Sequence, residues 1–171
     1  MNDKLLDIRL LLLDVDGVMT DGGIIYDANG METKVFNVKD GHGIKMLQRH
    51  GIEVGIITGR TSLVVDFRAK ELGIELVYQG ALKKIESYCD VKQRTGLLDS
   101  QIAYMGDDLI DVPVMHRVIF AAAPADALIE ARNAAHYVTA LAGGRGAVRE
   151  VCDLILKGRG LWNEVATRYE L

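Results

Sequence analysis

Two carboxylates at the end of an apolar run are the residues with the clearest chemical potential. Asp14 lies near the end of the mainly apolar run 9–15, and Asp16 directly follows the run. Residues two apart on an extended backbone point to the same side, so both carboxylates would face one space while Val15 faces the core. Carboxylates this close repel one another unless a cation lies between them. Mg²⁺ is the natural cation, because it takes hard oxygen ligands and shares its shell with phosphate.

Further polar side chains stand at the ends of later apolar runs. They are Thr58, Lys84, Asp107 and Asp108. Because the carboxyl ends of parallel strands meet at one rim of a sheet, where ligands bind, we expect these side chains to lie close to Asp14. One such aspartate alone would be read as a loop cap. Three carboxylates with a threonine and a lysine instead favour a metal and phosphate site.

The elements that must position these residues follow from the hydrophobic pattern. Apolar runs alternate with helical patterns, which predicts an α/β fold: a Rossmann-like parallel sheet with helices on both faces. The expected strands are 9–15, 53–58, 76–78, 101–105, 118–121 and 137–139. The expected helices are 40–50, 62–72, 82–94, 109–116, 126–132 and 146–157. Turn residues between two short β-rich pieces predict a small β-hairpin flap at about 22–36, and the tail at about 158–171 predicts only terminal fraying.

Composition limits the class of protein. The chain has 171 residues, of which 49% are hydrophobic and 26% charged, which is typical of one globular domain spanning 1–171. The net charge of −4 argues against a nucleic-acid partner. The apolar stretch Leu10–Leu13 is too short for a membrane span or signal peptide core, and Cys89 and Cys152 form no disulfide framework. We therefore expect a cytoplasmic protein with no membrane partner.

Four motifs in order resemble those of the haloacid dehalogenase superfamily. Residues 11–21 (LLLDVDGVMTD) resemble its first motif, 56–60 (IITGR) its second, Lys84 its third and 106–111 (GDDLID) its fourth. The paired aspartates alone are a weak signal, whereas the ordered set is specific and spans most of the domain.

The resemblance implies a role for each motif residue. Asp14 attacks phosphorus and forms an aspartyl-phosphate, which is covalent catalysis by a carboxylate. Asp16 protonates the leaving oxygen and then activates water. Thr58 hydrogen-bonds the phosphoryl oxygens, and Lys84 neutralises their charge. Mg²⁺ is held by the side chains of Asp14 and Asp107 and by the backbone carbonyl of Asp16.

The spacing of the motifs leaves little room for the cap domain that usually closes such a site. Between Asp16 and Asp40 the chain offers only the hairpin, and between Lys84 and Asp107 only a helix with its connections. A bare site would be wet, which weakens charge stabilisation. Either a macromolecular substrate or a neighbouring subunit would have to cover it.

The wider sequence resembles one capless branch, the 3-deoxy-D-manno-octulosonate 8-phosphate (KDO 8-P) phosphatases. Residues 36–44 and 142–150 carry this likeness beyond the four motifs. It implies Mg-dependent hydrolysis of KDO 8-P to KDO and phosphate in lipopolysaccharide biosynthesis. It also implies a homotetramer whose hairpins form an intersubunit barrel and whose neighbouring subunits cap the active sites.

The same resemblance implies a substrate-binding set, consistent with the several cations that a doubly anionic sugar acid phosphate needs. The set is Asp16, Asn37, Val38, Lys39, Asp40, Gly41, Lys45, Arg60, Arg68 and Lys84. Position 45 is lysine where arginine is common in the family, and Arg68 reads equally well as a solvated helix residue. For residues 143–146 we expect a structural role at the rim of the site in preference to anion binding. For Asp111 we expect a role in orienting the loop that binds the metal.

Two alternatives stay open. One is the same chemistry on a nine-carbon keto-sugar acid 9-phosphate (KDN 9-P). The segment 143–150 and the pair Arg60 and Arg68 favour the eight-carbon substrate over this one. The other is a non-catalytic domain that partners a sugar nucleotidyltransferase. The complete motif set argues against a domain that has lost its activity.

Overall fold

Six short strands form one parallel sheet in the computed structural model, which describes residues 2–170. The strands are β1 (Leu10–Leu13), β4 (Glu53–Ile57), β5 (Leu76–Tyr78), β6 (Ile102–Met105), β7 (Phe120–Ala123) and β8 (Tyr137–Val138). Their order is β5-β4-β1-β6-β7-β8, with every neighbouring pair parallel. Strand β1 is therefore central, and its carboxyl end lies between those of β4 and β6.

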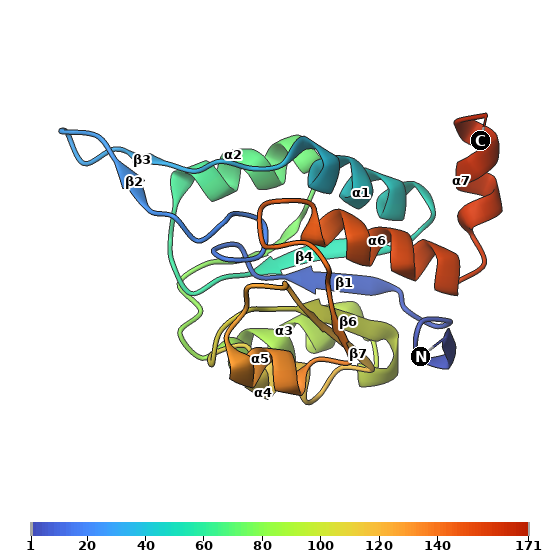
Figure 1. Cartoon of the computed structure of the whole chain (residues 1–171). Helices are drawn as coiled ribbons and strands as arrows, with labels where there is room; N and C mark the ends of the chain where they lie inside the picture. The colour runs from blue at the N-terminus through green and yellow to red at the C-terminus, as the bar shows by residue number, and fades with distance from the viewer. Residues whose placement is uncertain (1, 171) are drawn as a thin grey trace.

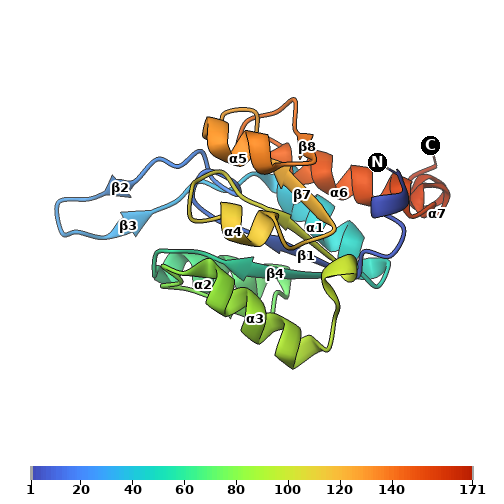
Figure 2. The same ribbon diagram turned by 90° about the horizontal axis from the view of Figure 1, so that it is seen from below.

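Helices cover both faces of the sheet, as the alternating pattern predicts (Figures 1 and 2). One face carries α1 (Val38–Arg49), α2 (Leu63–Leu72) and α6 (Ala147–Gly158). The other carries α3 (Lys84–Thr95), α4 (Val112–Met115) and α5 (Ile129–Ala134). The short 3₁₀ turns Asn2–Lys4 and Asp99–Gln101 complete the elements around the sheet. The Rossmann-like α/β prediction is confirmed.

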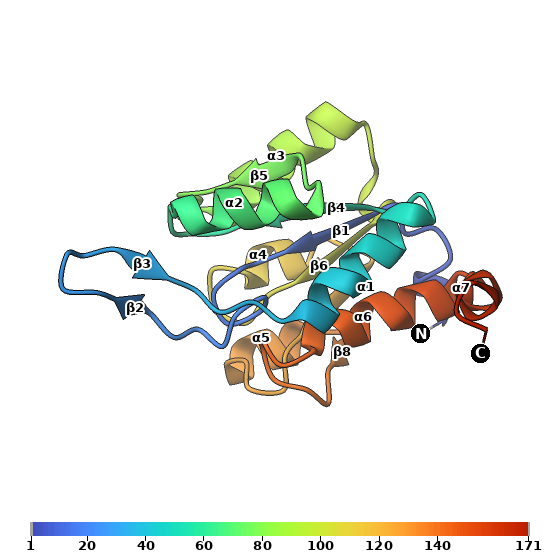
Figure 3. The same ribbon diagram turned by 90° about the horizontal axis from the view of Figure 1, so that it is seen from above.

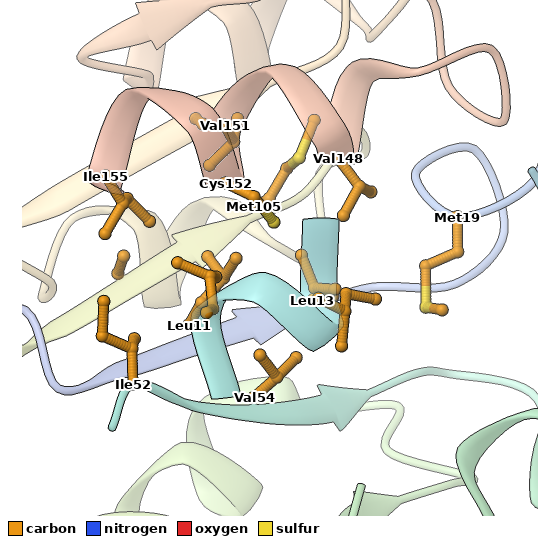
Figure 4. Close-up of a cluster of buried hydrophobic side chains, with 14 of the residues drawn as sticks. Leu11, Leu13, Met19, Ile52, Val54, Met105, Val148, Val151, Cys152 and Ile155 are labelled. Carbon is orange, nitrogen blue, oxygen red and sulfur yellow. The ribbon is translucent and has the colours of Figure 1, made fainter. Parts of the chain in front are cut away.

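Strand β1 supplies the centre of the core on both sides. Leu11 and Leu13 join the cluster under α1 and α6, while Leu10 and Leu12 join the cluster under α3 and α4, and all four are fully buried. Figure 4 shows Leu11 and Leu13 below side chains of α6, among them Val148. Each buried leucine contributes roughly 1.5–3 kcal/mol to the free energy of unfolding, so β1 is a firm base for the residues that follow it.

Helix α1 begins earlier than its apolar pattern indicates. The predicted start was residue 40, but the helix starts at Val38 because the side chain of Asn37 accepts a hydrogen bond from the Lys39 amide at 2.8 Å. An asparagine in this position satisfies an amide that has no partner within the helix. The cap carries the chain directly from the hairpin into α1.

The predicted hairpin is present as β2 (Ile25–Tyr26) and β3 (Glu32–Thr33), paired antiparallel. It extends well away from the sheet (Figures 1 and 3). The Asp27 carboxylate accepts hydrogen bonds from the amides of Asn29 and Met31, which closes the turn, and the Met31 bond lowers the pKa of Asp27. Five apolar residues here have about half or more of their surface exposed: Ile24, Ile25, Tyr26, Met31 and Val35.

The expectation of a merely frayed tail is wrong for residues 162–168, which form α7 (Trp162–Arg168). This helix packs on α6 through the buried Val165. The Tyr169 hydroxyl lies 2.7 Å from His42 Nε2 and accepts a hydrogen bond from Arg49 at 3.2 Å. Helix α7 lies at the end of the molecule opposite the hairpin (Figure 1). No helix in the described residues is both long and apolar enough to cross a membrane.

Two glycines lock the start of α6 onto the loop after β1. A Cβ built on Gly143 would lie 1.8 Å from the Gly17 carbonyl oxygen, and the Gly144 amide donates to the Val18 carbonyl at 3.0 Å. The Gly143 amide also donates to Asp126 at 2.9 Å. This close backbone contact supports a structural role for the segment at the rim.

We predict that Gly143→Ala strongly destabilises the protein, because its new methyl group meets backbone that no rotamer change can move. The expected loss in the free energy of unfolding is about 3 kcal/mol. Gly160→Ala is the matched control, since a Cβ there meets no atom within 4 Å and only the positive φ of 71° opposes it. Its expected cost is about 1 kcal/mol. Urea unfolding of both variants would contradict the prediction if their midpoints fell equally.

Candidate active site

A buried lysine joins Asp14 of the predicted site to Asp111 in the loop after β6. The ammonium of Lys84, at the start of α3, lies 2.8 Å from Asp14 Oδ2 and 2.6 Å from Asp111 Oδ1. The Lys84 side chain has no exposed surface. The other oxygen of Asp14 accepts a hydrogen bond from the Val15 amide at 2.7 Å. Asp14 is therefore held at the end of β1 by contacts to both of its oxygens.

Burial and ion pairing oppose each other at this pair. Burial raises the pKa of Asp14 to about 6, although the charge of Lys84 works against the rise. Burial alone would lower the pKa of Lys84, but the carboxylates of Asp14 and Asp111 outweigh it and the net shift is upward. Lys84 thus remains a cation beside Asp14.

Asp107, in the loop after β6, is the least satisfied carboxylate of the site. Its Oδ1 is buried and has no hydrogen-bond partner among the described residues. Burial raises the pKa of Asp107 to about 8, and the negative charges of Asp14 and Asp111 add to the rise. Oxygens of these three carboxylates lie within 4.8 Å of one another.

Asp111 has a different position from the other two, because both of its oxygens are fully engaged. Oδ1 accepts from Lys84 and from the hydroxyl of the buried Tyr104 at 2.5 Å. Oδ2 accepts from the amides of Asp107 and Asp108, both at 3.0 Å. This side chain shapes the loop that carries Asp107 and has little capacity left to bind a metal ion.

The remaining donor set suits a hard divalent cation. Three carboxylates face one ammonium, and Asp14 and Asp107 present oxygens, one of them orphaned, to the same space. Mg²⁺ prefers such oxygen ligands and completes its shell with water or phosphate. The residues of the site therefore fit the metal that the sequence predicts.

A cavity of about 180 Å³ opens in front of these groups. Its lining residues are Asp14, Asp16, Thr58, Gly59, Arg60, Asp107, Asp108 and Ile110. Ligand cavities usually measure about 300–1,000 Å³, so this one suits a phosphate group better than a whole sugar phosphate. Larger cavities of about 430 and 580 Å³ lie at the amino ends of the strands, around Gly51 and Glu53, without the carboxylate cluster. We place the site by its chemistry, not by its volume.

The hairpin reaches this cavity through a network of four charges. Lys34 lies 2.5 Å from Asp16 Oδ1 and 3.3 Å from Glu32 Oε1. Arg60 lies 3.1 Å from Glu32 and 3.7 Å from Asp16 Oδ2. Ser62, which caps α2, hydrogen-bonds the second oxygen of Glu32. The hairpin is thereby bound to the ends of both β1 and β4.

Sequence reasoning missed Lys34 and Glu32. A lysine in an exposed hairpin ordinarily reads as solvated, yet only 1% of the Lys34 side chain is exposed. Its contact with Asp16 spans 18 positions and follows from how the hairpin folds back on β1. No local pattern signals such a contact.

Four of the expected substrate-binding residues lie around the start of α1, at the rim of the site. None of the four lines this cavity, and each is either hydrogen-bonded within the protein or exposed to solvent. Asn37 caps α1 and donates to the Gly144 carbonyl at 3.4 Å, while Val38 and Lys39 are exposed. Asp40 is buried and accepts from the Arg149 amide in the first turn of α6 at 2.8 Å. These contacts join α1 to α6 at the edge of the site.

The remaining three expected residues lie where α1 meets α2. Arg68 pairs with Glu71 at 2.8 Å and donates to the Asn37 carbonyl at 3.4 Å, and a Cβ on Gly41 would strike its guanidinium. Lys45 donates to the Leu72 carbonyl at 2.5 Å, at the C-terminal end of α2. Lys45 is not among the residues that line the cavity, and its ammonium interacts with the negative end of that helix.

Comparison with known proteins identifies the chain's relatives. No protein-family model matches the chain. Over 158 residues it is 49% identical to the 3-deoxy-D-manno-octulosonate 8-phosphate phosphatase of Escherichia coli K12, covering 92% of this chain and 84% of that protein. The chain belongs to the family of these phosphatases. This is the capless branch that the sequence motifs resemble.

Solved structures agree with this family. The crystal structure of the Moraxella catarrhalis phosphatase, in complex with magnesium ion, phosphate ion and KDO, has a TM-score of 0.94 and 42% identity, with 97% of this chain and 96% of that one covered. A cobalt-bound form of the Haemophilus influenzae phosphatase has a TM-score of 0.89 and 43% identity, with 92% of each chain covered. The two KDO 8-P phosphatase structures therefore contain divalent metals.

We predict that Mg²⁺ stabilises the folded chain through Asp107. Adding Mg²⁺ to metal-free protein is expected to raise the melting temperature by several degrees, because the ion offsets the repulsion among buried carboxylates and binds only the folded state. In Asp107→Asn the rise is expected to disappear. The metal-free variant is expected to be no less stable than the wild type, since the asparagine is neutral, as is the protonated carboxyl that the raised pKa of Asp107 favours near neutral pH.

Thermal unfolding with and without the ion measures this effect. Asp7→Asn is the matched control, because Asp7 is exposed and lies outside the cluster, so its response to Mg²⁺ should equal that of the wild type. An unchanged Mg²⁺ response in Asp107→Asn would contradict the assignment.

Proposed function

We propose that this chain is a Mg-dependent phosphatase that hydrolyses KDO 8-P to KDO and phosphate, a step of lipopolysaccharide biosynthesis. The observation that carries the proposal is the cluster of Asp14, Lys84 and Asp107 beside a phosphate-sized cavity, in a chain 49% identical to an enzyme of this name. A relative of known structure contains magnesium, phosphate and KDO. We further propose that the single α/β unit carries the whole activity.

In the proposed first half-reaction, a carboxylate oxygen of Asp14 attacks phosphorus. The bond from phosphorus to the sugar oxygen breaks, its electron pair stays on that oxygen, and a proton from Asp16 neutralises it. In the second half-reaction, water attacks the aspartyl-phosphate and gives its proton to Asp16, which restores the Asp14 carboxylate and releases phosphate. Both proton transfers require Asp16 at the cavity wall, where it lies.

Charge stabilisation is assigned to Lys84, which lies behind Asp14, and to Thr58 in the cavity lining. Lys84, paired with Asp14, neutralises the phosphoryl oxygens, and Thr58 donates a hydrogen bond to them. When bound, Mg²⁺ adds positive charge at the same oxygens. We propose that the side chains of Asp14 and Asp107 and the backbone carbonyl of Asp16 hold it.

For the rest of the substrate, we propose Arg60 as the principal cation. It lines the cavity and 42% of its side chain is exposed, so it can meet an anion at the mouth. The rim formed by residues 37–41 with Arg68 would contact the sugar, in keeping with the family resemblance. Lys45 is left out of this proposal because its ammonium is committed to α2.

We also propose that the chain works as a homotetramer in the cytoplasm, with neighbours covering each site. The cavity is small and open, and the projecting hairpin exposes Ile24, Ile25 and Val35, which water does not favour. Pairing of hairpins between subunits would bury these side chains. Cys89 and Cys152 are free thiols, which suits a reducing compartment.

We predict that the enzyme releases phosphate from KDO 8-P only with a divalent metal, and that Asp14→Asn lowers the rate by at least about 1,000-fold, because no nucleophile remains. The measurement is phosphate release from a panel of sugar acid phosphates with Mg²⁺ or a chelator, with Asp7→Asn as the control. A preference for KDN 9-P by about tenfold in kcat/KM, or about 1.4 kcal/mol, would replace the proposed substrate. Activity of Asp14→Asn would overturn the nucleophile.

We predict that Ile25→Asp dissociates the tetramer, because a charge cannot be buried between hairpins without a partner. Light scattering after size exclusion is expected to give a lower mass for this variant. Leu6→Asp is the control, since Leu6 is 53% exposed and lies outside the hairpin. A monomeric wild type, or a tetramer that survives Ile25→Asp, would contradict the assembly.

A further inference from the structure

We propose that Lys34 is the positioning residue of Asp16, so that the hairpin is a working part of the catalytic site within each subunit. The proposal rests on the proposed function, which gives Asp16 its proton-transfer role. Lys34 itself does not line the cavity, and its proposed role runs through its contact with Asp16 and involves no contact of its own with phosphate or sugar.

The burial of Lys34 shows that its contact with Asp16 is specific. Only 1% of its side chain is exposed, and its ammonium lies 2.5 Å from Asp16 Oδ1. Lysines are almost never fully buried unless paired, because an unpaired ammonium loses its hydration without compensation. The ion pair therefore restricts the side chains of Lys34 and Asp16 to one relative orientation.

The hairpin holds Lys34 in place from the opposite side. Glu32, in β3, contacts the Lys34 ammonium at 3.3 Å and also bonds Arg60 and the hydroxyl of Ser62. The Ser62 hydrogen bond lowers the pKa of Glu32, and so do the nearby cations, which keeps this side chain charged. The segment that carries Lys34, directly after β3, is thus held against the N-terminal cap of α2.

This arrangement leaves one oxygen of Asp16 available for chemistry. Lys34 holds Oδ1, while Oδ2 accepts no hydrogen bond from residues 2–170 and lies 3.7 Å from Arg60 Nε, beyond hydrogen-bond distance. Arg60 cannot replace Lys34, because its Nη2 is already engaged with Tyr26 and Glu32. A proton donor must be aligned closely with the leaving oxygen, and small displacements lower the rate strongly. Lys34 sets that alignment.

The test compares two aryl phosphates of similar shape, neither of which carries a carboxylate. Phenyl phosphate and 4-nitrophenyl phosphate differ by about three pKa units in their leaving groups, so only the first depends strongly on protonation. In Lys34→Met, kcat/KM for phenyl phosphate is expected to fall about 30-fold, and for 4-nitrophenyl phosphate by less than about 3-fold. Lys70→Met, in the exposed part of α2, is the control and should match the wild type.

A second comparison uses Asp16→Asn, alone and with Lys34→Met. If Lys34 acts through Asp16, adding Lys34→Met to Asp16→Asn lowers kcat/KM no further. Equal losses on the two aryl phosphates, or losses that multiply in the double variant, would overturn the proposal. Circular dichroism monitors the fold, and Lys34→Gln replaces Lys34→Met if the latter unfolds. Unfolding of both variants would assign Lys34 a purely structural role and would likewise reject the proposal.

Failure of the proposed phosphatase chemistry gives a different result. In that case the wild type would not cleave either aryl phosphate in a manner that depends on Asp14. Failure of the positioning role instead leaves an active wild type with the wrong pattern of losses.

Discussion

The buried contact of Lys84 with Asp14 and Asp111 is the interaction on which the site depends. It ties the end of β1 to the start of α3 and to the loop between β6 and α4. One cation cannot balance the three carboxylates gathered there, so Asp107 retains an unsatisfied oxygen. The architecture thereby creates a local excess of negative charge that a divalent cation can neutralise.

The sheet and the hairpin share the work of placing polar groups. The parallel sheet brings the ends of β1, β4 and β6 together, and the core under β1 keeps them rigid. The hairpin adds what no strand end supplies, a lysine carried back to Asp16. Because the same hairpin exposes apolar residues away from the cavity, we propose that assembly and catalysis make use of one element.

Much of the fold and of the site's location could be predicted from the sequence. Asp14, Asp16, Thr58 and Asp107 each follow an apolar run, and a parallel sheet must bring such positions to one rim; all four line the cavity. The expected helix 62–72 nearly coincides with α2, which follows its cap Ser62 and ends before Gly73, because capping chemistry depends on neighbouring residues alone. The roles assigned to these side chains stay predictions.

The sequence by itself determined the strand and helix alternation, the rim that carries the aspartates and the family of the chain. Hydrophobic periodicity is a local property, and the order of the motifs can be read directly along the chain. Only the tertiary structure decided which distant group meets each charge. Lys34 rather than solvent neutralises Asp16, Lys45 turns to the end of α2, and Tyr169 docks α7 near His42. These contacts depend on three-dimensional packing, which determines where a buried or partly buried charge or hydroxyl finds its partner. The residues next to each group in the sequence do not indicate which distant residue that partner is.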